Sequence, residues 1–316
     1  MKRNVWVGLF VLLLCWFVAA CRPAPQTPEA HNTQRTATIY YKKHRPRAAQ
    51  EEPSNPGTSE SQPTAPAYDA PWYQERNREL AETIRRNDPQ ASQEQIESDI
   101  ARMAIDPDKP MVALTFDDGP TPGVTDQILD VLAQYNARAT FFVCGWRFAR
   151  EECKTILKRI AAQGCEIGNH TWSHIKLLEQ NYVGVRYEIE NTNDIIFETT
   201  GVRPRCFRPP GGQNSYEATR VTRENDMIIV LWSQSGNVHE YDPNRIAENV
   251  GKQIVNGREL QNGDVILLHD TPQCMVDAVK IMVPRLIDQG YQLVTVWELL
   301  NCSGEEIVPG TVYQEW

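Results

Sequence analysis

From Met111 onward the chain alternates short apolar runs with amphipathic stretches, and this alternation predicts the fold class. Around Val279, Met282 and Leu286, apolar residues recur at i, i+3 and i+7, which is the spacing of a helix. About seven alternations of strand and helix predict a parallel β/α layer structure or barrel. The apolar runs predicted as strands are Met111–Phe116, Ala139–Cys144, Cys165–Gly168, Cys206–Arg208, Met227–Trp232, Asp264–His269 and Gln292–Val296.

The first residues have the pattern of an export signal. Two basic residues precede an unbroken apolar run at positions 5–20, which is short for a transmembrane helix of about 20 residues. The tripeptide Val18-Ala19-Ala20 before Cys21 is similar to the lipobox of bacterial lipoproteins, where cleavage leaves a lipid-modified cysteine at the new N-terminus. We expect residues 1–20 to be a lipoprotein-type signal peptide and Cys21 to anchor the exported chain to a bacterial membrane, facing the periplasm or the cell surface. An uncleaved anchor and a plainly secreted form are the alternatives.

Composition divides the rest of the chain into four segments. Residues 21–71 are rich in proline and polar residues and lack the apolar content to fold, so they are predicted to form a flexible tether. Residues 72–109 have sparse apolar positions and are predicted as a helical lead-in that packs on the main domain. The main domain is expected at residues 110–302, and residues 303–316 are expected to be a C-terminal tail.

The charge distribution narrows the classes of partner. Residues 1–50 hold eight of the 32 Lys and Arg residues but one of the 41 Asp and Glu residues, so the remainder carries 24 basic and 40 acidic side chains. Binding to a nucleic-acid backbone needs clustered cations, and this acidic body is therefore a poor nucleic-acid binder. A neutral or cationic polymer, or a metal ion, is the more suitable partner.

Six of the eight cysteines lie in the body of the chain, and an even number in an exported protein permits up to three disulfides. Cys153 and Cys165 are not expected to pair, because they flank one predicted helix and lie about 18 Å apart along it. No CxxC spacing occurs, which argues against a structural zinc site. The six body cysteines are Cys144, Cys153, Cys165, Cys206, Cys274 and Cys302.

Two polar clusters that follow predicted strands offer metal ligands. Asp117 and Asp118 come before a Gly-Pro turn, and adjacent side chains of a strand diverge, so the two carboxylates can address different groups. His170 and His174 are spaced i, i+4, which would place both imidazoles on one face of a helical turn. One Asp and two His with open positions suit a catalytic zinc ion. An acidic turn and a surface histidine pair are the alternatives for each cluster taken alone.

Two further clusters also follow predicted strands. Arg208 precedes Pro-Pro-Gly-Gly, where it can pair with a carboxylate and where the glycines allow the backbone to approach a ligand closely. His269 ends the buried run Val265–Leu268. A rigid turn and a core histidine are the alternatives for these two. Because the carboxyl ends of the strands carry the chemistry of β/α barrels, we expect all four clusters to meet at one edge.

Four motifs resemble, in the same order, those of the polysaccharide deacetylases, the NodB-homology domains of carbohydrate esterase family 4: TFDDGP at 115–120, HTWSH at 170–174, FRPPGG at 207–212 and LLH at 267–269. The resemblance covers about residues 110–300 and implies a distorted, often incomplete, (β/α) barrel. It also implies a divalent metal, usually zinc, with cobalt and nickel as alternatives. The implied roles are metal ligand for Asp118, His170 and His174, general base for Asp117, general acid for His269, partner of Asp117 for Arg208, and acetyl-methyl pocket for Leu267.

The sequence departs from the family pattern at two places. Gly211 stands where the family usually has Tyr, which keeps the backbone N–H that binds the oxyanion but removes a ring that faces the sugar. The family's next motif has an Asp-Trp pair that supports the catalytic histidine and forms the floor of the site. Residues 232–242 take its place here, with Tyr241 expected to contact the substrate and Glu240 or Asp242 as candidate supports of His269.

The resemblance predicts a monomeric, metal-dependent hydrolase that removes N-acetyl groups from an amino-sugar polysaccharide of the cell envelope. The expected substrate is the N-acetylglucosamine of peptidoglycan, a chitin-like polymer or an exported poly-N-acetylglucosamine. An O-acetyl polysaccharide esterase of the same fold is the first alternative, and it would depend less on His269 because an alkoxide leaves more easily than an amine. A glycan-binding relic without turnover is the second alternative, suggested by the altered fourth motif.

Overall fold

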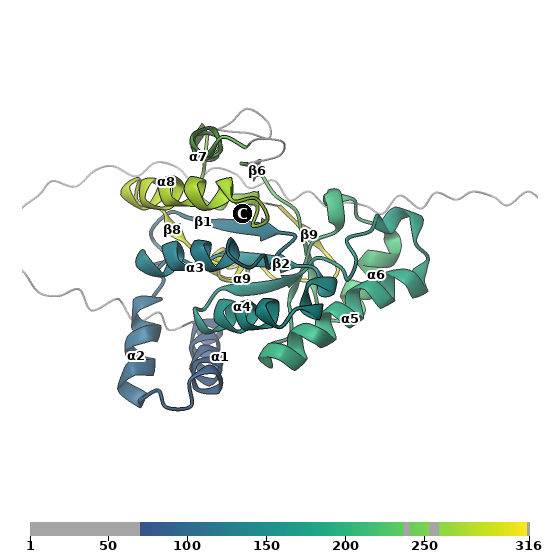
Figure 1. The fold of residues 1–316 in the computed structure, drawn as a ribbon, viewed down its shortest axis with the longest axis horizontal. Helices are drawn as coiled ribbons and strands as arrows, with labels where there is room; N and C mark the ends of the chain where they lie inside the picture. Colours follow the sequence, from purple (N-terminus) through teal and green to yellow (C-terminus); the bar gives the residue numbers. More distant parts are fainter. Residues whose placement is uncertain (1–69, 237–240, 253–258, 315–316) are drawn as a thin grey trace, which may run out of the picture. The chain divides into compact units, whose positions relative to one another are not determined.

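The computed structural model describes residues 70–236, 241–252 and 259–314 (Figure 1). The predicted signal peptide, the predicted lipidation site Cys21, nearly all of the predicted tether and the candidate support Glu240 lie outside the described residues. Within the described ranges, no helix combines the length and the apolar content needed to cross a membrane.

A sheet of nine strands forms the centre of the described chain, and all of its pairings are parallel. The strands are β1 Met111–Asp117, β2 Thr140–Val143, β3 Glu166–Asn169, β4 Cys206–Phe207, β5 Ile228–Val230, β6 Gln234–Ser235, β7 Val265–His269, β8 Gln292–Leu293 and β9 Val312–Tyr313. Their order is β6-β7-β1-β2-β3-β4-β5-β9, and β8 pairs with the beginning of β1. The predicted distorted, incomplete (β/α) barrel is confirmed as a curled half-barrel of parallel strands, and β6 and β9 are two short strands that the hydrophobic pattern did not predict.

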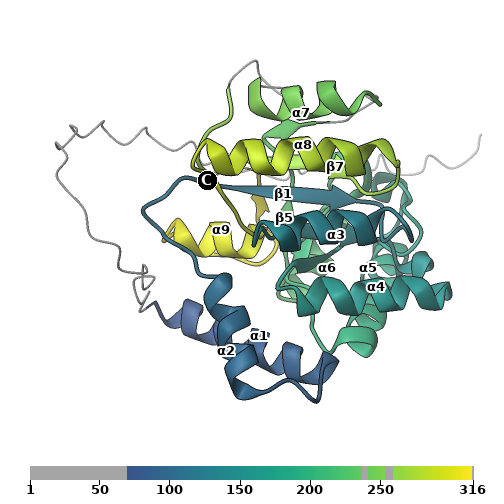
Figure 2. The same cartoon turned by 60° about the vertical axis from the view of Figure 1, so that its left-hand side comes forward.

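Each of six helices follows one strand and packs beside the helix of the neighbouring strand (Figure 2). The six are α3 Thr125–Gln134, α4 Glu151–Ala162, α5 Tyr182–Thr200, α6 Tyr216–Glu224, α7 Pro243–Lys252 and α8 Cys274–Asp288. Their contacts run in the order α7, α8, α3, α4, α5, α6, which is the order of the strands that precede them. This is the connectivity of a β/α barrel, in which each helix returns the chain to the start of the next strand.

Alternate side chains of the strands point to opposite faces of the sheet, and each face has its own core. On one face Phe116 and Phe141 stack with ring centroids 5.1 Å apart, and they pack against Leu129 of α3. On the other face Phe142 belongs to a cluster with Leu300 of α9, Val296–Cys302. Because both faces are covered, β1 is buried at every position, and an unbroken apolar run is the result in the sequence.

The predicted helical lead-in consists of two helices, α1 Pro71–Asn87 and α2 Gln93–Arg102. They pack together through a small cluster that includes Leu80, Ile84 and Ile96. Helix α1 also contacts α4, which lies within residues 110–302.

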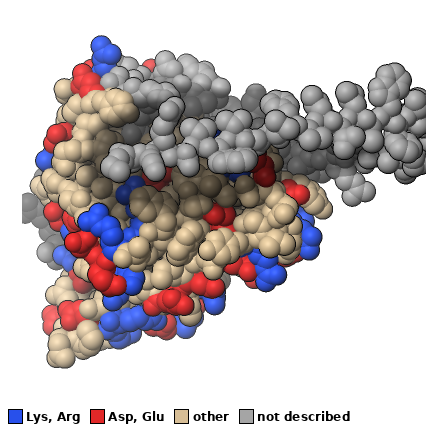
Figure 3. Space-filling view, turned by 45° about the vertical axis from the view of Figure 1, so that its right-hand side comes forward, with Lys and Arg blue, Asp and Glu red and all other residues tan. Residues whose placement is uncertain are grey.

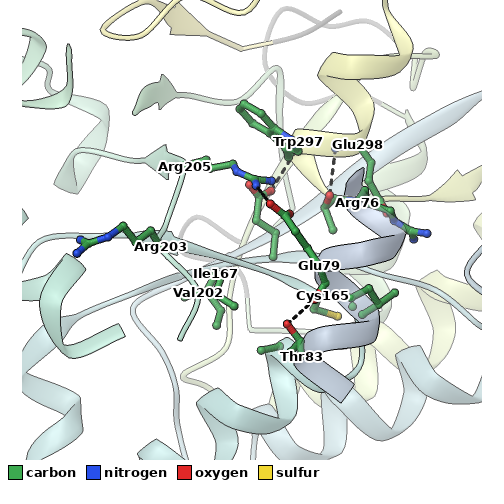
Figure 4. Close-up of a pocket in the computed structure, with 15 residues that line it drawn as sticks. Arg76, Glu79, Thr83, Cys165, Ile167, Val202, Arg203, Arg205, Trp297 and Glu298 are labelled. Atoms are coloured by element: carbon green, nitrogen blue, oxygen red, sulfur yellow. Dashed lines mark hydrogen bonds and ion pairs between the residues drawn. The ribbon is translucent and has the colours of Figure 1, made fainter. Parts of the chain in front are cut away.

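A pocket with apolar and charged lining residues lies between α1, the start of β3 and the start of α9 (Figure 4). At this pocket Arg205, just before β4, forms an ion pair with Glu79 of α1. Glu298 of α9 is buried and accepts hydrogen bonds from Arg76 of α1 at 2.9 Å and from Arg138 at 3.0 Å. These ion pairs join the lead-in to the edge of the sheet at which β3 and β4 begin.

The structure differs from two expectations about the body of the chain. Residues 303–316 were expected to be a tail, but they contain β9, whose Val312 pairs in register with Ile229 of β5. This strand has two half-buried residues, so no apolar run marks it in the sequence. No disulfide joins the six body cysteines, all of which lie in the described ranges, although their even number permitted up to three. Burial raises the pKa of the Cys165 thiol to about 12, which disfavours its thiolate.

Candidate metal centre and active site

The carboxyl ends of neighbouring strands bring the four polar clusters to one edge of the sheet. Strand β1 ends at Asp117, which pairs in register with His269 at the end of β7. Strand β3 ends at Asn169, which pairs in register with Phe207 of β4, so that the residues directly after them, His170 and Arg208, lie at the same edge. The expectation that the clusters meet at one edge is confirmed by this register.

Three side chains at this edge are arranged to hold one metal ion. The ligand atoms of Asp118, His170 and His174 all lie within 4.8 Å of one another. Nε2 of His174 and Nε2 of His170 lie 3.1 Å and 3.4 Å from the same atom, Oδ1 of Asp118. His170 is buried, whereas the side chain of His174 is 43% exposed, so the cluster is open to solvent on that side. Two imidazoles and one carboxylate with an open side are a donor set of catalytic zinc sites.

Backbone reversals, rather than a helix, bring the two histidines together. The i, i+4 spacing predicted a helical turn, but residues 170–176 are not helical, and this detail of the prediction is wrong. Asp118, Thr171 and His174 have φ values of 75°, 69° and 58°, in the left-handed region that costs a non-glycine residue about 1–3 kcal/mol. Oγ1 of Thr171 accepts a hydrogen bond from the backbone N–H of His174 at 3.0 Å, which holds the turn.

Hydrogen bonding determines which nitrogen of His170 faces Asp118. Nδ1 of His170 lies 2.7 Å from the carbonyl oxygen of Arg208, so Nδ1 carries the proton and donates it. The lone pair of Nε2 then faces Oδ1 of Asp118, a buried atom that accepts no hydrogen bond from any described residue. Two lone pairs at this separation repel each other unless a cation lies between them. The residues therefore fit a divalent metal ion.

The closeness of the three side chains also shifts the pKa values of Asp118 and His174. Burial raises the pKa of the Asp118 carboxyl, but the adjacent imidazoles of His170 and His174 outweigh burial when they are protonated and hold this pKa well below its usual range. A protonated His174 can donate to the Asp118 carboxylate, which in turn raises the pKa of His174. A proton on His174 and a metal ion would occupy the same position, so metal binding should weaken as the pH falls through that raised pKa.

Asp117 is held in one orientation by Arg208, a fully buried side chain. Nη1 of Arg208 donates to Oδ1 of Asp117 and to Oγ1 of Thr115, both at 2.7 Å. The other guanidinium nitrogens donate to the carbonyl oxygens of Val230 at 3.1 Å and Leu231 at 2.9 Å. Oδ2 of Asp117 faces the metal ligands and lies 3.7 Å from the nearer histidine nitrogen. One carboxylate oxygen is thus tied down and the other is free to accept a proton at the site.

The other predicted site residues lie at different depths around this edge. His269 is half-buried at the end of β7, and Leu267 is buried two positions earlier. Gly211 has a φ of 65°, and a Cβ there would meet open space. Tyr241 is 70% exposed, and the Asp242 carboxylate accepts a hydrogen bond from the backbone at the start of α7 at 2.9 Å. The roles predicted for these residues stay predictions.

Asn169 orders the loop that carries the histidines, and the sequence analysis missed it. Its Nδ2 donates to the carbonyl oxygen of Ile189 at 2.8 Å and to Oδ1 of Asn193 at 2.7 Å. Its Oδ1 accepts from the backbone N–H of Thr171 at 2.8 Å. The sequence offered one indication of this role, because Asn169 lies between a predicted strand and His170.

Asp270 was also missed, although it directly follows His269. It is fully buried behind the loop that carries Asp118, and its Oδ2 accepts a hydrogen bond from Oγ1 of Thr125 at 2.5 Å. Its Oδ1 has no hydrogen-bond partner among the described residues. The carboxyl lies against the backbone of Gly119, where a Cβ would be 2.1 Å from Oδ2. Burial raises the pKa of Asp270 to about 7.

The chain is similar to several known proteins. Peptidoglycan-N-acetylmuramic acid deacetylase PdaC of Bacillus subtilis is 39% identical over 198 residues, which are 62% of this chain and 40% of that relative. Its solved structure is similar, with a TM-score of 0.58 and 36% identity over 63% of this chain and 94% of that structure. A peptidoglycan-N-acetylglucosamine deacetylase of Bacillus cereus is 38% identical over 202 residues, which are 60% of this chain and 88% of that relative.

A third relative was solved with a metal ion. A family 4 acetyl xylan esterase from Clostridium thermocellum, in complex with cobalt, has a TM-score of 0.58 and 32% identity over 65% of this chain and 98% of that structure. The family model for polysaccharide deacetylases matches residues 104–230, which include three of the four motifs. The chain belongs to the polysaccharide deacetylase family, carbohydrate esterase family 4.

Proposed function

We propose that the chain is a metal-dependent hydrolase that removes N-acetyl groups from the amino sugars of peptidoglycan. The observation that carries this proposal is the cluster of three possible ligand atoms, from Asp118, His170 and His174, within 4.8 Å of one another, beside an Asp117 carboxylate that Arg208 holds in place. The relatives from Bacillus support a cell-wall polysaccharide as the substrate class. A divalent ion held by Asp118, His170 and His174, with zinc as the first candidate, supplies Lewis acidity to the acetyl carbonyl.

The chain's own residues account for the proton transfers of amide hydrolysis. Asp117 accepts a proton from the water that attacks the acetyl carbon, because its Oδ2 is directed at the site. The backbone N–H of Gly211 donates to the oxyanion. His269 donates a proton to the nitrogen as the carbon–nitrogen bond breaks, since an unprotonated amine is a poor leaving group. The products are acetate and an amino sugar with a free amine.

The face of the molecule in Figure 3 does not have the charge pattern that binds the backbone of a polyanion. On the face shown in Figure 3, acidic and basic side chains are interspersed around a region of uncharged residues. No continuous basic surface is visible among the described residues of that face. A polysaccharide recognised by local contacts at the site suits this surface better than a nucleic acid does.

Acetate release by the purified full chain tests the proposal. With zinc present, we expect release from peptidoglycan, loss of release after treatment with a chelator, and recovery when zinc is added back. Full activity in the chelated enzyme would contradict the metal-dependent mechanism. Release from O-acetyl xylan but from no N-acetylated glycan would favour an esterase, and glycan binding without any release would favour a relic.

We also propose that the chain is lipid-anchored through Cys21 to a bacterial membrane. The basic start, the apolar run at positions 5–20 and the Val-Ala-Ala-Cys boundary support this anchor. Mass spectrometry of the native N-terminus should find a diacylglycerol-modified Cys21. An unmodified Cys21, or an intact Met1, would contradict the proposal.

A further inference from the structure

The segment after β2 connects the two loops that carry the metal ligands. Its backbone N–H groups donate to both loops, through Cys144 N to Gly119 O (3.1 Å), Gly145 N to Thr171 O (3.0 Å) and Trp146 N to Trp172 O (2.9 Å). A Cβ on Gly145 would lie 2.3 Å from the ring of Trp172, so this position needs glycine. Trp146 and Arg147 therefore lie at the rim of the site, between the Asp118 loop and the His174 loop.

One guanidinium nitrogen of Arg147 is held by a hydrogen bond, and the other two form no hydrogen bond with the described residues. Its Nε donates to the backbone carbonyl oxygen of Asp118 at 3.0 Å, and its guanidinium carbon lies 4.3 Å from the ring centroid of Trp146. Neither of its Nη groups makes a hydrogen bond or an ion pair with any residue that the structure describes. Trp146 is 46% exposed and Arg147 is half-buried, so a substrate can reach the guanidinium.

Positioning of the Asp118 loop does not by itself account for an arginine at this place. A single neutral donor would be enough to bind the carbonyl oxygen. The guanidinium adds a positive charge and an edge with two parallel N–H groups, which is the geometry that binds a carboxylate in bidentate fashion. The carboxylates nearby do not use this edge, because Asp117 is paired with Arg208 and Oδ1 of Asp118 faces the histidines.

We propose that Arg147 is a specificity-determining residue that binds a carboxylate carried by the acetylated glycan chain. This inference rests on the deacetylase function proposed above. N-acetylmuramic acid differs from N-acetylglucosamine by a 3-O-lactyl group, which places a carboxyl group beside the 2-acetamido group. With that acetamido group at Asp118, Arg147 is the neighbouring cation, because it donates to the Asp118 carbonyl oxygen. The proposed pose directs the 3-substituent toward this cation. The inferred target is therefore the N-acetylmuramic acid of peptidoglycan.

The carboxylate has two chemical sources in peptidoglycan, and the probes must separate them. In glycan strands without stem peptides the lactyl carboxylate is free, whereas in intact strands it is amide-linked and the acids belong to the peptide. Four probes are needed: peptide-free strands, the same strands with the lactyl groups converted to methylamides, peptide-bearing strands, and neutral N-acetylglucosamine oligomers. The sugar that loses acetate is identified by mass spectrometry.

Three variants of the full chain, loaded with zinc, complete the experiment. Arg147→Gln removes the charge but keeps a neutral donor for the Asp118 carbonyl, and Arg147→Lys keeps the charge without the paired N–H groups. Arg150→Gln is the matched control, because Arg150 is exposed, lies at the end of the same segment and pairs with Glu152. Metal content is measured for each variant, since Arg147 contacts the loop of a metal ligand.

We expect Arg147→Gln to raise KM about tenfold on the probe whose carboxylate Arg147 binds, with kcat changed less than twofold and metal content unchanged. Arg147→Lys should recover part of this loss, and Arg150→Gln should behave like the natural chain. A fall in kcat of the same size on all probes would overturn the inference in favour of a positioning role. Equal use of the acidic and methylamide strands by the natural chain, together with an unchanged KM of Arg147→Gln on the peptide-bearing strands, would also overturn it. Failure of the proposed function is distinguishable, because no probe would then release acetate with any variant.

Discussion

The substitution Asp270→Asn should make the fold more stable at pH 8 and leave its stability nearly unchanged at pH 4. Burial raises the pKa of the Asp270 carboxyl from an ordinary value of 3.8 to about 7. A carboxyl with a raised pKa binds its proton more tightly in the folded state than in the unfolded chain. The natural fold therefore loses stability as the pH rises from about 4 to about 7, with no further loss above that range. Asn has nearly the same shape and cannot ionise.

The expected difference in the free energy of unfolding follows from the pKa shift of Asp270 and from the surroundings of its carboxyl group. A shift of about three pKa units at roughly 1.4 kcal/mol each gives an upper limit of about 4 kcal/mol. Asn can keep its oxygen toward Oγ1 of Thr125 and place its amide at the position of Oδ1, which has no hydrogen-bond partner among the described residues. Protonated Asp270 has an unsatisfied donor at the same place, so the two forms should be of similar stability at pH 4.

Chemical denaturation between pH 4 and pH 8 measures the free energy of unfolding of the natural chain and of Asp270→Asn. A chelator is included so that metal binding does not contribute to the free energy of unfolding. The difference between Asp270→Asn and the natural chain should grow by about 2–4 kcal/mol over this range and then reach a plateau. Asp277→Asn is the control, because the Asp277 side chain is 55% exposed and should give a difference near zero at every pH. A difference for Asp270→Asn that stays constant from pH 4 to pH 8 would refute the reasoning.

Three other substitutions test the site and the lead-in. His174→Ala should abolish activity and reduce metal content from about one ion per chain to near none, because a catalytic site needs its third ligand. Near-UV circular dichroism should show an unchanged fold. Retained metal would contradict the assignment of His174 as a ligand. His269→Ala should slow N-deacetylation about 10²–10⁴-fold but affect an activated O-acetyl ester much less, and equal losses would exclude the acid role. Glu298→Gln should lower the free energy of unfolding by about 3–5 kcal/mol, because it leaves Arg138 buried without its charge partner. Chemical denaturation measures this change. A loss below about 1 kcal/mol would show that the fold does not depend on this ion pair.

The sequence predicted the long central strands because both faces of the sheet are covered. Met111–Phe116 was predicted and β1 is Met111–Asp117, while Asp264–His269 was predicted and β7 is Val265–His269. The two-residue strands β6 and β9 gave no such signal, since periodicity needs several positions to be visible. The lengths of apolar runs therefore determined which strands could be found.

The sequence pointed to the three residues that form the candidate metal site, but not to the way the backbone arranges them. The spacing of His170 and His174 suggested a helical turn, whereas left-handed residues produce the approach of the two rings. Asp270 and Arg147 could not be identified, because their importance depends on contacts with residues far away in the sequence. Asp270 lies against Gly119, and Arg147 binds the backbone of Asp118.

The ion pairs around Glu298 have a mechanical consequence for a chain that is pulled from its N-terminal side. Any force applied upstream of Pro71 enters the domain through α1, whose Arg76 shares Glu298 with Arg138. These contacts lie where β3 and β4 begin, whereas the metal ligands and Asp117 follow the opposite ends of the strands. A chain anchored through its N-terminal side, as proposed above, would therefore take up load at the edge of the sheet that is remote from the loops of the candidate metal site.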